Sequence, residues 1–284
     1  MKLCRFQTDH QLPCVGLLAN DAVFDLSGEG IDSLSALLEF EGLLPQLTTL
    51  AGQNLPRLPL ADVRLLPPVE RQEVWAVGVT YLRSKTARME ESDFSATAYD
   101  KVYDAPRPEL FFKSLAEKVA GTHDTVGIRR DAKWNVPEPE LALIINSRGH
   151  ITGFTIGNDM SSRDIESENL LYLPQAKIYE RSCALGPCIA VGASEAEARQ
   201  WGIKIEILRG GAAVFQGETS VGKIKRTFGE LVEYLFRSQK FPHGAVLLTG
   251  TGVVPPDGFT LQLGDKIQIN ISGIGTLENS VVEV

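Results

Sequence analysis

The sequence predicts an α+β protein that is mostly β, with a small N-terminal α+β domain ahead of a larger one. Short segments rich in β-branched and aromatic residues, each bounded by Gly, Asp or Asn, recur along most of the 284 residues. Segments with apolar residues at helical spacing are few. A proline-studded connector at residues 57–72 separates the two parts, so we place the domains at residues 1–68 and 69–284.

The N-terminal part combines short strands with a helical segment. Strands are expected at residues 1–6, 14–21 and 22–27. Asn20 and Asp21 are typical of a hairpin corner between the second and third of these strands. Residues 31–51 have apolar side chains at helical spacing, and Asp32 or Ser33 is suited to cap the start of that helix.

Strands dominate the larger domain. They are expected at residues 73–81, 109–114, 140–147, 150–157, 189–193, 203–210, 212–217, 245–251 and 265–275. Helices are expected at residues 81–92, at 194–200 with Ser194 as N-cap, and at 227–239 after Thr227. These elements predict a mixed, mostly antiparallel sheet packed on itself, with helices at its edges.

Composition and charge narrow the classes of function. The formal net charge of −8 argues against a nucleic-acid partner, because neutralising phosphates requires clustered Lys and Arg. No apolar run approaches the roughly 20 residues that span a bilayer, and the N-terminal segment carries charges where a signal peptide is apolar. We therefore expect a cytoplasmic protein without a membrane partner. The four cysteines show no CxxC spacing, which argues against a zinc site or a redox pair.

Three carboxylates interrupt apolar, β-prone segments. Glu138 and Glu140 are two residues apart, so on a strand both project from one face, and Asp159 ends the next apolar run. Ionised carboxylates at the edge of a core require compensating charge. Because the group contains neither Cys nor His, it favours a hard divalent ion, Mg²⁺ or alternatively Mn²⁺ or Ca²⁺. The alternative is that Glu138 and Glu140 lie on the solvated face of a half-exposed strand.

The residues that follow Asp159 favour the metal site over that alternative. Residues 158–177 form a polar segment directly after a hydrophobic strand, as expected for a loop that carries a site. Its polar side chains are Asp159, Ser161, Ser162, Arg163, Asp164, Glu166 and Lys177.

From about Glu70 to Val284 the chain resembles the fumarylacetoacetate hydrolase superfamily. The resemblance rests on ordered blocks, which read AVGVTY, PELFFK, EPELALII, GFTIGNDMSSRD, a lysine followed by CALGP, LLTGT, and LGDKIQINISGIGTLENSV. It implies a mixed β-roll fold, homodimers or higher homo-oligomers, and a divalent ion held by Glu138, Glu140 and Asp159. It also implies a small-molecule 2-oxo acid substrate, whose enolate such an ion stabilises as a Lewis acid.

One block departs from the pattern of the carbon–carbon hydrolases in this superfamily. Their block carries a His and a Glu that activate water, but here Ser84 and Ala87 stand at those positions. Neither side chain accepts a proton at neutral pH as a His–Glu pair does. The departure therefore argues against hydrolysis of the fumarylacetoacetate type.

The same block and the segment LYLPQAKIYERSCALGP resemble the sugar-acid branch of the superfamily. The resemblance implies a metal-dependent hydro-lyase that dehydrates a 2-keto-3-deoxy sugar acid, such as 2-keto-3-deoxy-arabinonate, to 2,5-dioxopentanoate. One alternative is an acylpyruvate or fumarylacetoacetate hydrolase or an oxaloacetate decarboxylase. Another is a homologue that binds a metabolite without turnover.

The resemblance also suggests roles for individual residues. Lys177 is expected near the reacting carbon, as a base or as a fixed positive charge. Glu166 is either an acid–base partner, an indirect contact or a solvated loop residue, and Arg163 either contacts substrate or pairs with a carboxylate. Thr251 is expected to contact substrate through its hydroxyl.

Further residues complete the expected site. Ser84, Lys85 and Arg88, on the helix predicted at 81–92, are candidates for binding sugar hydroxyls or the substrate carboxylate. Lys113 matches a family lysine that would pair with a metal-ligand carboxylate. His123 is the one histidine in a segment expected to border the site.

Overall fold

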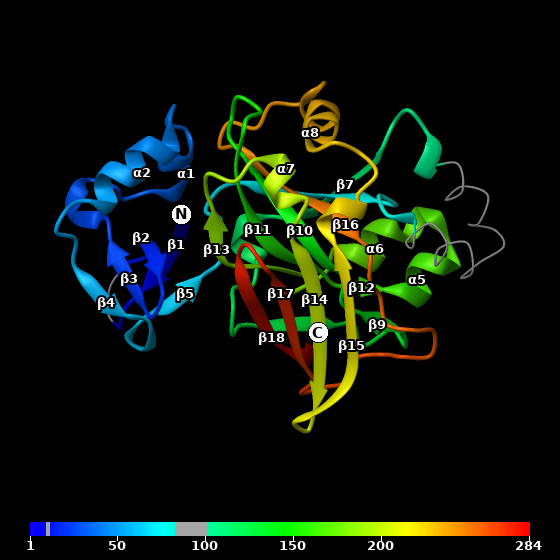
Figure 1. Ribbon diagram of the computed structural model, residues 1–284. Helices are drawn as coiled ribbons and strands as arrows, with labels where there is room; N and C mark the ends of the chain where they lie inside the picture. The colour runs from blue at the N-terminus through cyan, green and yellow to red at the C-terminus, as the bar shows by residue number, and fades with distance from the viewer. Residues whose placement is uncertain (10–11, 83–101) are drawn as a thin grey trace.

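The computed structural model describes residues 1–9, 12–82 and 102–284. Figure 1 shows the N-terminal elements beside a larger body of strands. The N-terminal strands are β1 (Lys2–Gln7), β2 (Cys14–Ala19), β3 (Ala22–Asp25), β4 (Arg57–Pro59) and β5 (Arg64–Leu66), and the helices are α1 (Leu34–Leu38) and α2 (Leu43–Ala51). Short 3₁₀ turns occupy Ser27–Glu29 and Leu60–Asp62.

The turn and helix-capping residues of the N-terminal part have the predicted roles, but one predicted helix is divided. Asn20 and Asp21 connect β2 to β3, and Asn20 has the positive φ of 53° that such a turn requires. Ser33 caps α1 by accepting the N–H of Ala36. The single helix predicted over residues 31–51 is wrong, because the chain leaves the helix after Leu38 and re-enters at Gly42, whose φ is +69°.

The larger body contains two further groups of strands. The long sheet holds β6 (Glu73–Gly78), β7 (Glu109–Ser114), β10 (Pro139–Ile145), β11 (Ile151–Asp159), β13 (Cys183–Ala190) and β16 (Ala245–Thr251). A five-stranded sheet holds β8 (Thr125–Ile128), β14 (Gly202–Arg209), β15 (Ala212–Ser220), β17 (Lys266–Ile271) and β18 (Gly275–Glu283), and β9 (Asn135–Val136) pairs with β12 (Ser161–Ser162). The order in the long sheet is β4-β3-β2-β1-β13-β11-β10-β16-β6-β7.

Within the described residues the pairing is mixed and mostly antiparallel, as predicted. The parallel pairs are β16 with β6 and β18 with β8. The helices of this body are α5 (Arg163–Glu168), α6 (Leu173–Lys177), α7 (Glu195–Ala198) and α8 (Phe228–Phe236), with 3₁₀ turns at Ala116–Lys118, Leu170–Tyr172 and Val221–Lys223. Ser194 and Thr227 cap α7 and α8 as expected. No helix of the described chain has the length and apolar character of a membrane span.

Three other sequence expectations need correction. The strand predicted at 189–193 starts earlier, at Cys183, because the whole run to Ala190 is buried in the sheet. The segment after Asp159, expected as a polar loop, folds into β12, α5 and α6, because β12 pairs with β9 and Arg163, Glu166 and Lys177 are buried. The strand predicted over 73–81 ends at Gly78, and residues 83–92 of the predicted helix lie outside the described residues.

β10 is the central strand of the core and is buried along its whole length. Leu141, Leu143 and Ile145 belong to the apolar cluster that includes the isoleucines of β14 and β17. Ala142 and Ile144 belong to the cluster that includes the leucines of α1 and α2. Both faces of this strand are therefore removed from water. An ionised glutamate within it is costly unless its charge is compensated by a cation or by hydrogen bonds.

The first 68 residues share both sheet and core with the rest of the chain. Lys2 and Leu3 of β1 pair with Ala190 and Ile189 of β13. The leucines of α1 and α2 lie in the same apolar cluster as Val246 and other residues of the long sheet. A separate domain over residues 1–68 stays a prediction.

Glu70 joins the connector to the start of α1. Its carboxylate accepts hydrogen bonds from the Ser33 hydroxyl at 2.8 Å and from the backbone N–H groups of Leu34 and Ser35 at 2.9 and 2.8 Å. Arg5 lies 3.5 Å from the same carboxylate. Burial alone would raise the pKa of Glu70, but these hydrogen bonds lower it below its ordinary value.

Replacing Glu70 with glutamine is expected to lower the free energy of unfolding by about 1–3 kcal/mol at neutral pH. Because the pKa of Glu70 is lowered by folding, its contribution is present above the ordinary carboxyl pKa and is lost as pH falls through the lowered value. Urea denaturation at neutral and at acid pH should show the difference from the wild type shrinking in acid. An equal difference at both pH values, or an equal loss in the exposed control Glu41→Gln, contradicts the assignment.

Candidate metal and substrate site

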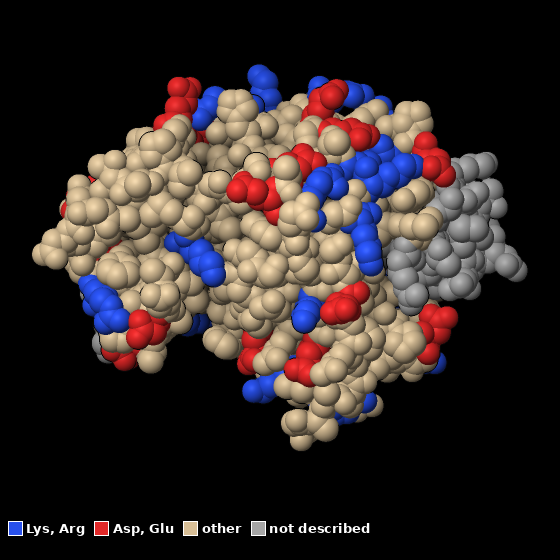
Figure 2. Space-filling view, in the orientation of Figure 1, with Lys and Arg blue, Asp and Glu red and all other residues tan. Residues whose placement is uncertain are grey.

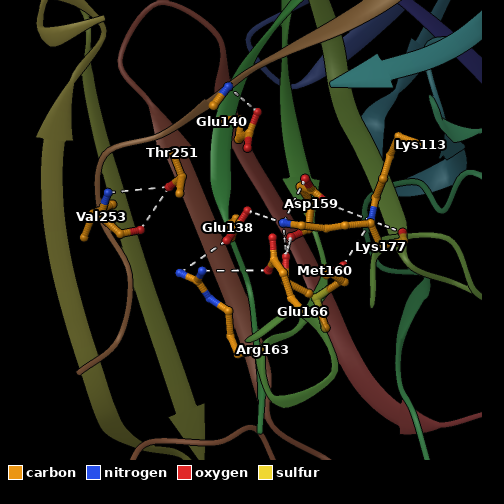
Figure 3. A network of polar contacts seen from close by, with 12 residues as sticks. Lys113, Glu138, Glu140, Asp159, Met160, Arg163, Glu166, Lys177, Thr251 and Val253 are labelled. Carbon is orange, nitrogen blue, oxygen red and sulfur yellow. Dashed lines mark hydrogen bonds and ion pairs between the residues drawn. The ribbon is translucent and has the colours of Figure 1, made fainter. Parts of the chain in front are cut away.

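Glu138, Glu140 and Asp159 meet where β10 and β11 pair. Glu140 lies opposite Gly157 in the antiparallel register, and the N–H of Asp159 donates to the carbonyl of Glu138 at 3.0 Å. One carboxylate oxygen from each residue lies within 4.8 Å of the other two (Figure 3). The side chains are buried, with residue exposures of 3%, 2% and 1%. The alternative of a solvated glutamate pair is therefore wrong. Figure 2 shows acidic and basic side chains interspersed on one face of the molecule.

Three buried cations surround these carboxylates. The ammonium of Lys177 lies 2.7 Å from Glu138 Oε2 and 3.4 Å from Asp159 Oδ2. Lys113 Nζ lies 2.5 Å from Asp159 Oδ1, as the family lysine was expected to. The guanidinium of Arg163 lies 3.4 Å from Glu138 Oε1, which supports the pairing alternative for this arginine.

Glu166 is a fourth buried carboxylate beside this group. One of its oxygens lies 3.8 Å from Nη1 of Arg163, and the residue is 3% exposed. The alternative of a solvated loop glutamate is therefore wrong. Among the described residues, these buried charged groups are thus four carboxylates and three cations, which leaves an excess of one negative charge when all are ionised.

Glu140 differs from the other three carboxylates in its partners. It accepts a hydrogen bond from the backbone N–H of Gly250 at 2.6 Å, and no Lys or Arg nitrogen of the described residues lies within 4.0 Å of it. Burial, and then the negative charges of Asp159 and Glu138, raise the pKa of Glu140 well above its ordinary value. Burial would also raise the pKa of Asp159, but Lys113 and Lys177 hold it below its ordinary value.

This arrangement suits a hard divalent cation. The three converging side chains offer only carboxylate oxygens, the donors that Mg²⁺, Mn²⁺ and Ca²⁺ prefer. A cation between them would also compensate the charge of an ionised Glu140, whose pKa stays raised despite the positive charge of Lys177. Glu138, Glu140 and Asp159 would hold such an ion.

Binding of Mg²⁺ is expected to release protons, because a ligating carboxylate must be ionised and the pKa of Glu140 is raised. The affinity should therefore increase with pH. The raised pKa also means that Glu140 stabilises the metal-free fold at low pH and ceases to do so as pH rises through its folded value. Isothermal titration calorimetry in buffers of different ionisation enthalpy measures the proton count. An affinity that does not change with pH, or Mg²⁺ binding without proton release, contradicts this prediction.

A small cavity of about 30 Å³ adjoins the carboxylates, a volume close to that of one water molecule or ion. Its lining includes four residues expected at the site from the sequence in addition to the three carboxylates, namely Lys177, Glu166, Arg163 and Thr251. Ser84, Lys85 and Arg88 lie outside the described residues. The structure thus brings together every expected site residue that it describes apart from His123.

His123 does not border this cavity. It lies in the turn before β8, with its side chain 75% exposed and Nδ1 3.6 Å from Glu278. Its backbone N–H donates to the carbonyl of Glu278 in β18, so the turn is held on the five-stranded sheet. The expectation that this histidine borders the site is wrong.

The end of β16 supplies a second wall of the site. Thr251 lines the cavity and donates its hydroxyl to the carbonyl of Val253 at 3.0 Å. Gly250 has a φ of +89°, and a Cβ there would lie 2.2 Å from Thr80 Oγ1. Thr80 in turn donates to the carbonyl of Thr249 at 2.6 Å, so it has little room to move. Only glycine at position 250 therefore places the N–H that binds Glu140.

Replacing Gly250 with alanine is expected to weaken Mg²⁺ binding about tenfold or more. The added methyl group would displace the backbone N–H of residue 250, and Glu140, which accepts from it, would move with it. Gly258→Ala is the matched control, since Gly258 has a similar φ of +85° and nothing lies within 4 Å of a Cβ built there. Calorimetric titration with Mg²⁺ compares the two variants. Equal Mg²⁺ affinities in the two variants would count against a special role for Gly250.

Several lining residues were missed in the sequence. They are Val77, Gly78, Val79, Glu109, Phe111 and Leu173. The signal for two of them was present, because Glu109 and Phe111 are two residues apart on β7 and therefore share one face. Gly78 of β6 is paired with Glu109, and the Glu109 side chain lies over it. A Cβ added at Gly78 would lie 2.0 Å from Glu109 Oε2.

Comparison with known proteins identifies similar sequences and folds. The family model for the fumarylacetoacetate (FAA) hydrolase C-terminal region matches residues 73–282. The chain is 40% identical to a probable 2-keto-3-deoxyxylonate dehydratase of Haloferax volcanii, with 97% of this chain and 99% of that protein covered. It is 36% identical to 2-dehydro-3-deoxy-D-arabinonate dehydratase of Saccharolobus solfataricus, with 98% and 95% covered.

A solved structure extends the similarity to the fold. It is described as 2-keto-3-deoxy-D-arabinonate dehydratase complexed with magnesium and 2,5-dioxopentanoate. It matches with a TM-score of 0.84 and 32% sequence identity, covering 100% of this chain and 99% of that chain. The predicted mostly β fold with a mixed β-roll is thereby confirmed.

Proposed function

The chain belongs to the fumarylacetoacetate hydrolase family, and from this premise we propose that it is a Mg²⁺-dependent hydro-lyase that dehydrates a 2-keto-3-deoxy sugar acid. The observation that carries the proposal is similarity over nearly the whole chain to two proteins described as dehydratases of this substrate class. The buried carboxylates of the site agree with it, because a 2-oxo acid requires a cation to bind among anionic groups.

A bound Mg²⁺ would supply a Lewis acid to the carboxylate and ketone oxygens of the substrate. Glu138, Glu140 and Asp159 would hold it, and Mn²⁺ or Ca²⁺ are alternative ions for the same donors. The remaining residues of the site act on the substrate itself. Removal of a proton from carbon 3 and of hydroxide from carbon 4 releases one water molecule and leaves a double bond between these carbons. Tautomerisation then moves one hydrogen from carbon 5 and one from its hydroxyl to carbons 3 and 4, which gives the aldehyde of 2,5-dioxopentanoate.

Lys177 is the residue that we place beside carbon 3. Its ammonium is 2% exposed and lines the cavity next to the three carboxylates. Two roles suit this position, removal of the carbon 3 proton by a neutral amine or stabilisation of developing negative charge by an ammonium. Glu166, buried on the same cavity, is placed to protonate the hydroxyl that leaves carbon 4.

Arg163 and Thr251 are proposed to bind the substrate from opposite sides of the cavity. Arg163 lies between Glu138 and Glu166, and its planar guanidinium is suited to a substrate carboxylate. The hydroxyl of Thr251 is proposed to hold a substrate oxygen. Ser84, Lys85 and Arg88 remain proposed contacts to sugar hydroxyls.

Two broader properties are also proposed. The family resemblance supports a homodimer, which light scattering during gel filtration would test. A cytoplasmic location is supported by the four free cysteines, because a reducing compartment keeps thiols unpaired.

The function is tested by incubating purified protein and Mg²⁺ with 2-keto-3-deoxy-arabinonate and 2-keto-3-deoxy-xylonate, and following products by NMR. We expect 2,5-dioxopentanoate to form and the reaction to stop with EDTA. Parallel incubations contain an acylpyruvate and oxaloacetate. Cleavage of these compounds, with the deoxy sugar acids left intact, would replace the dehydratase by the hydrolase or decarboxylase alternative. Binding of the deoxy sugar acids without turnover would indicate a metabolite-binding homologue.

A further inference from the structure

Lys113 makes three contacts from a position that is closed to solvent. Its residue exposure is 0%, and its ammonium lies 2.5 Å from Asp159 Oδ1. The same nitrogen donates to the backbone carbonyl of Met160 at 3.0 Å and to the backbone carbonyl of Lys177 (Figure 3). The ammonium thus donates two hydrogen bonds to backbone carbonyls and makes an ion pair with the Asp159 carboxylate.

The acceptors come from two segments that are distant along the chain. Asp159 ends β11 and Met160 follows it, whereas Lys177 is the last residue of α6. The carbonyl of a residue at a helix C-terminus has no partner within its own helix. Lys113 satisfies that carbonyl and thereby ties the end of α6 to the aspartate of the proposed metal site.

A second residue of β7 contacts the side chain of Lys177. Phe111 is two residues before Lys113 on the same strand. The Lys177 ammonium lies 5.8 Å from the centre of the Phe111 ring, within the range of a cation–π contact. β7 therefore contacts Lys177 at both its backbone and its ammonium.

We propose that Lys113 is a positioning residue that fixes Asp159 and Lys177 relative to each other, with Phe111 supporting the Lys177 side chain. The inference rests on the proposed function, since it assigns Asp159 to the metal and Lys177 to the substrate. Lys113 does not contact the substrate in this account. Its effect reaches the reaction through the two residues that it holds.

The three-way contact requires a compact ammonium. A guanidinium is planar and larger, and its N–H groups point within one plane, so arginine cannot contact the two carbonyls and the Asp159 carboxylate in the same geometry. Lys113→Arg keeps the positive charge that Asp159 needs but changes the geometry. This variant therefore tests positioning separately from charge compensation. Lys113→Met would remove both at once.

The experiment compares the wild type with Lys113→Arg, Phe111→Leu and the control Lys118→Arg, whose lysine is exposed on the 3₁₀ turn after β7. Thermal melting first establishes that each variant is folded. Calorimetry then gives the Mg²⁺ dissociation constant, and steady-state assays with 2-keto-3-deoxy-arabinonate give kcat and KM. We expect Lys113→Arg to lower both Mg²⁺ affinity and kcat by about 10- to 100-fold.

Phe111→Leu should lower kcat while Mg²⁺ affinity stays at the wild-type value, because the ring contacts Lys177 and not Asp159. The control should match the wild type. Folded Lys113→Arg with wild-type Mg²⁺ affinity and kcat would overturn the positioning role. If Lys113→Arg does not fold, Phe111→Leu decides whether β7 positions Lys177, and an unchanged kcat there overturns it. A wild type that neither binds Mg²⁺ nor dehydrates the substrate would instead refute the proposed function.

Discussion

Replacing Glu140 with glutamine is expected to abolish tight Mg²⁺ binding and to lower the rate of dehydration about 10³-fold or more. A metal Lewis acid contributes several kcal/mol of charge stabilisation, and each 1.36 kcal/mol corresponds to a tenfold change in rate. The fold should survive, because glutamine still accepts the N–H of Gly250 and carries no charge. Since folding raises the pKa of Glu140, the neutral side chain should leave the metal-free protein at least as stable as the wild type at neutral pH.

Glu138→Gln is the matched comparison for this prediction. It also removes a proposed metal ligand, but it leaves Lys177 and Arg163 without the full charge of their partner. Metal binding should be lost in both variants, whereas only Glu138→Gln should destabilise the metal-free protein. Calorimetry with Mg²⁺ and urea denaturation in EDTA give the two quantities. Destabilisation of Glu140→Gln with retained Mg²⁺ binding would contradict the assignment of Glu140.

Replacing Lys177 with methionine is expected to lower kcat about 10²- to 10⁴-fold, the range attributed to a general acid or base. The same change removes a buried cation that lies 2.7 Å from Glu138 and 3.4 Å from Asp159. Breaking a buried ion pair from one side costs about 3–5 kcal/mol, so the metal-free variant should be less stable than the wild type. Mg²⁺ should restore part of that stability, because it supplies positive charge to the same carboxylates.

Single-turnover kinetics and thermal melting with and without Mg²⁺ measure both effects. Lys118→Met, at an exposed lysine, is the control and should change neither. Lys177→Arg then distinguishes the two roles proposed for Lys177, because arginine keeps the charge but does not give up a proton at neutral pH. Dehydration by Lys177→Met at the wild-type rate would remove Lys177 from the reaction.

The three proposed metal ligands were predictable because a strand has a period of two. Glu138 and Glu140 share one face for that reason, and the hairpin of β10 with β11 brings Asp159 beside them. The ordered blocks that resemble the fumarylacetoacetate hydrolase superfamily are confirmed by the match over residues 73–282. These features are encoded locally, in spacing and in short motifs.

The contacts among the buried charges were not predictable in the same way. Lys113 and Lys177 are 64 residues apart, and the carbonyl that joins them becomes an acceptor only because α6 ends there. The sequence does not indicate where α6 ends, because this segment resembles a polar loop. Glu109 was missed because its side chain reaches the cavity by crossing Gly78 on the neighbouring strand.

The central claim is that Glu138, Glu140 and Asp159 together hold one divalent ion at the place where a 2-oxo acid reacts. Anomalous diffraction from crystals grown with Mn²⁺ and pyruvate tests it most directly. The account predicts one strong manganese peak within about 2–2.5 Å of an oxygen from each of the three carboxylates, with pyruvate oxygens completing the coordination. A manganese peak elsewhere, with no manganese among these three carboxylates, would contradict it.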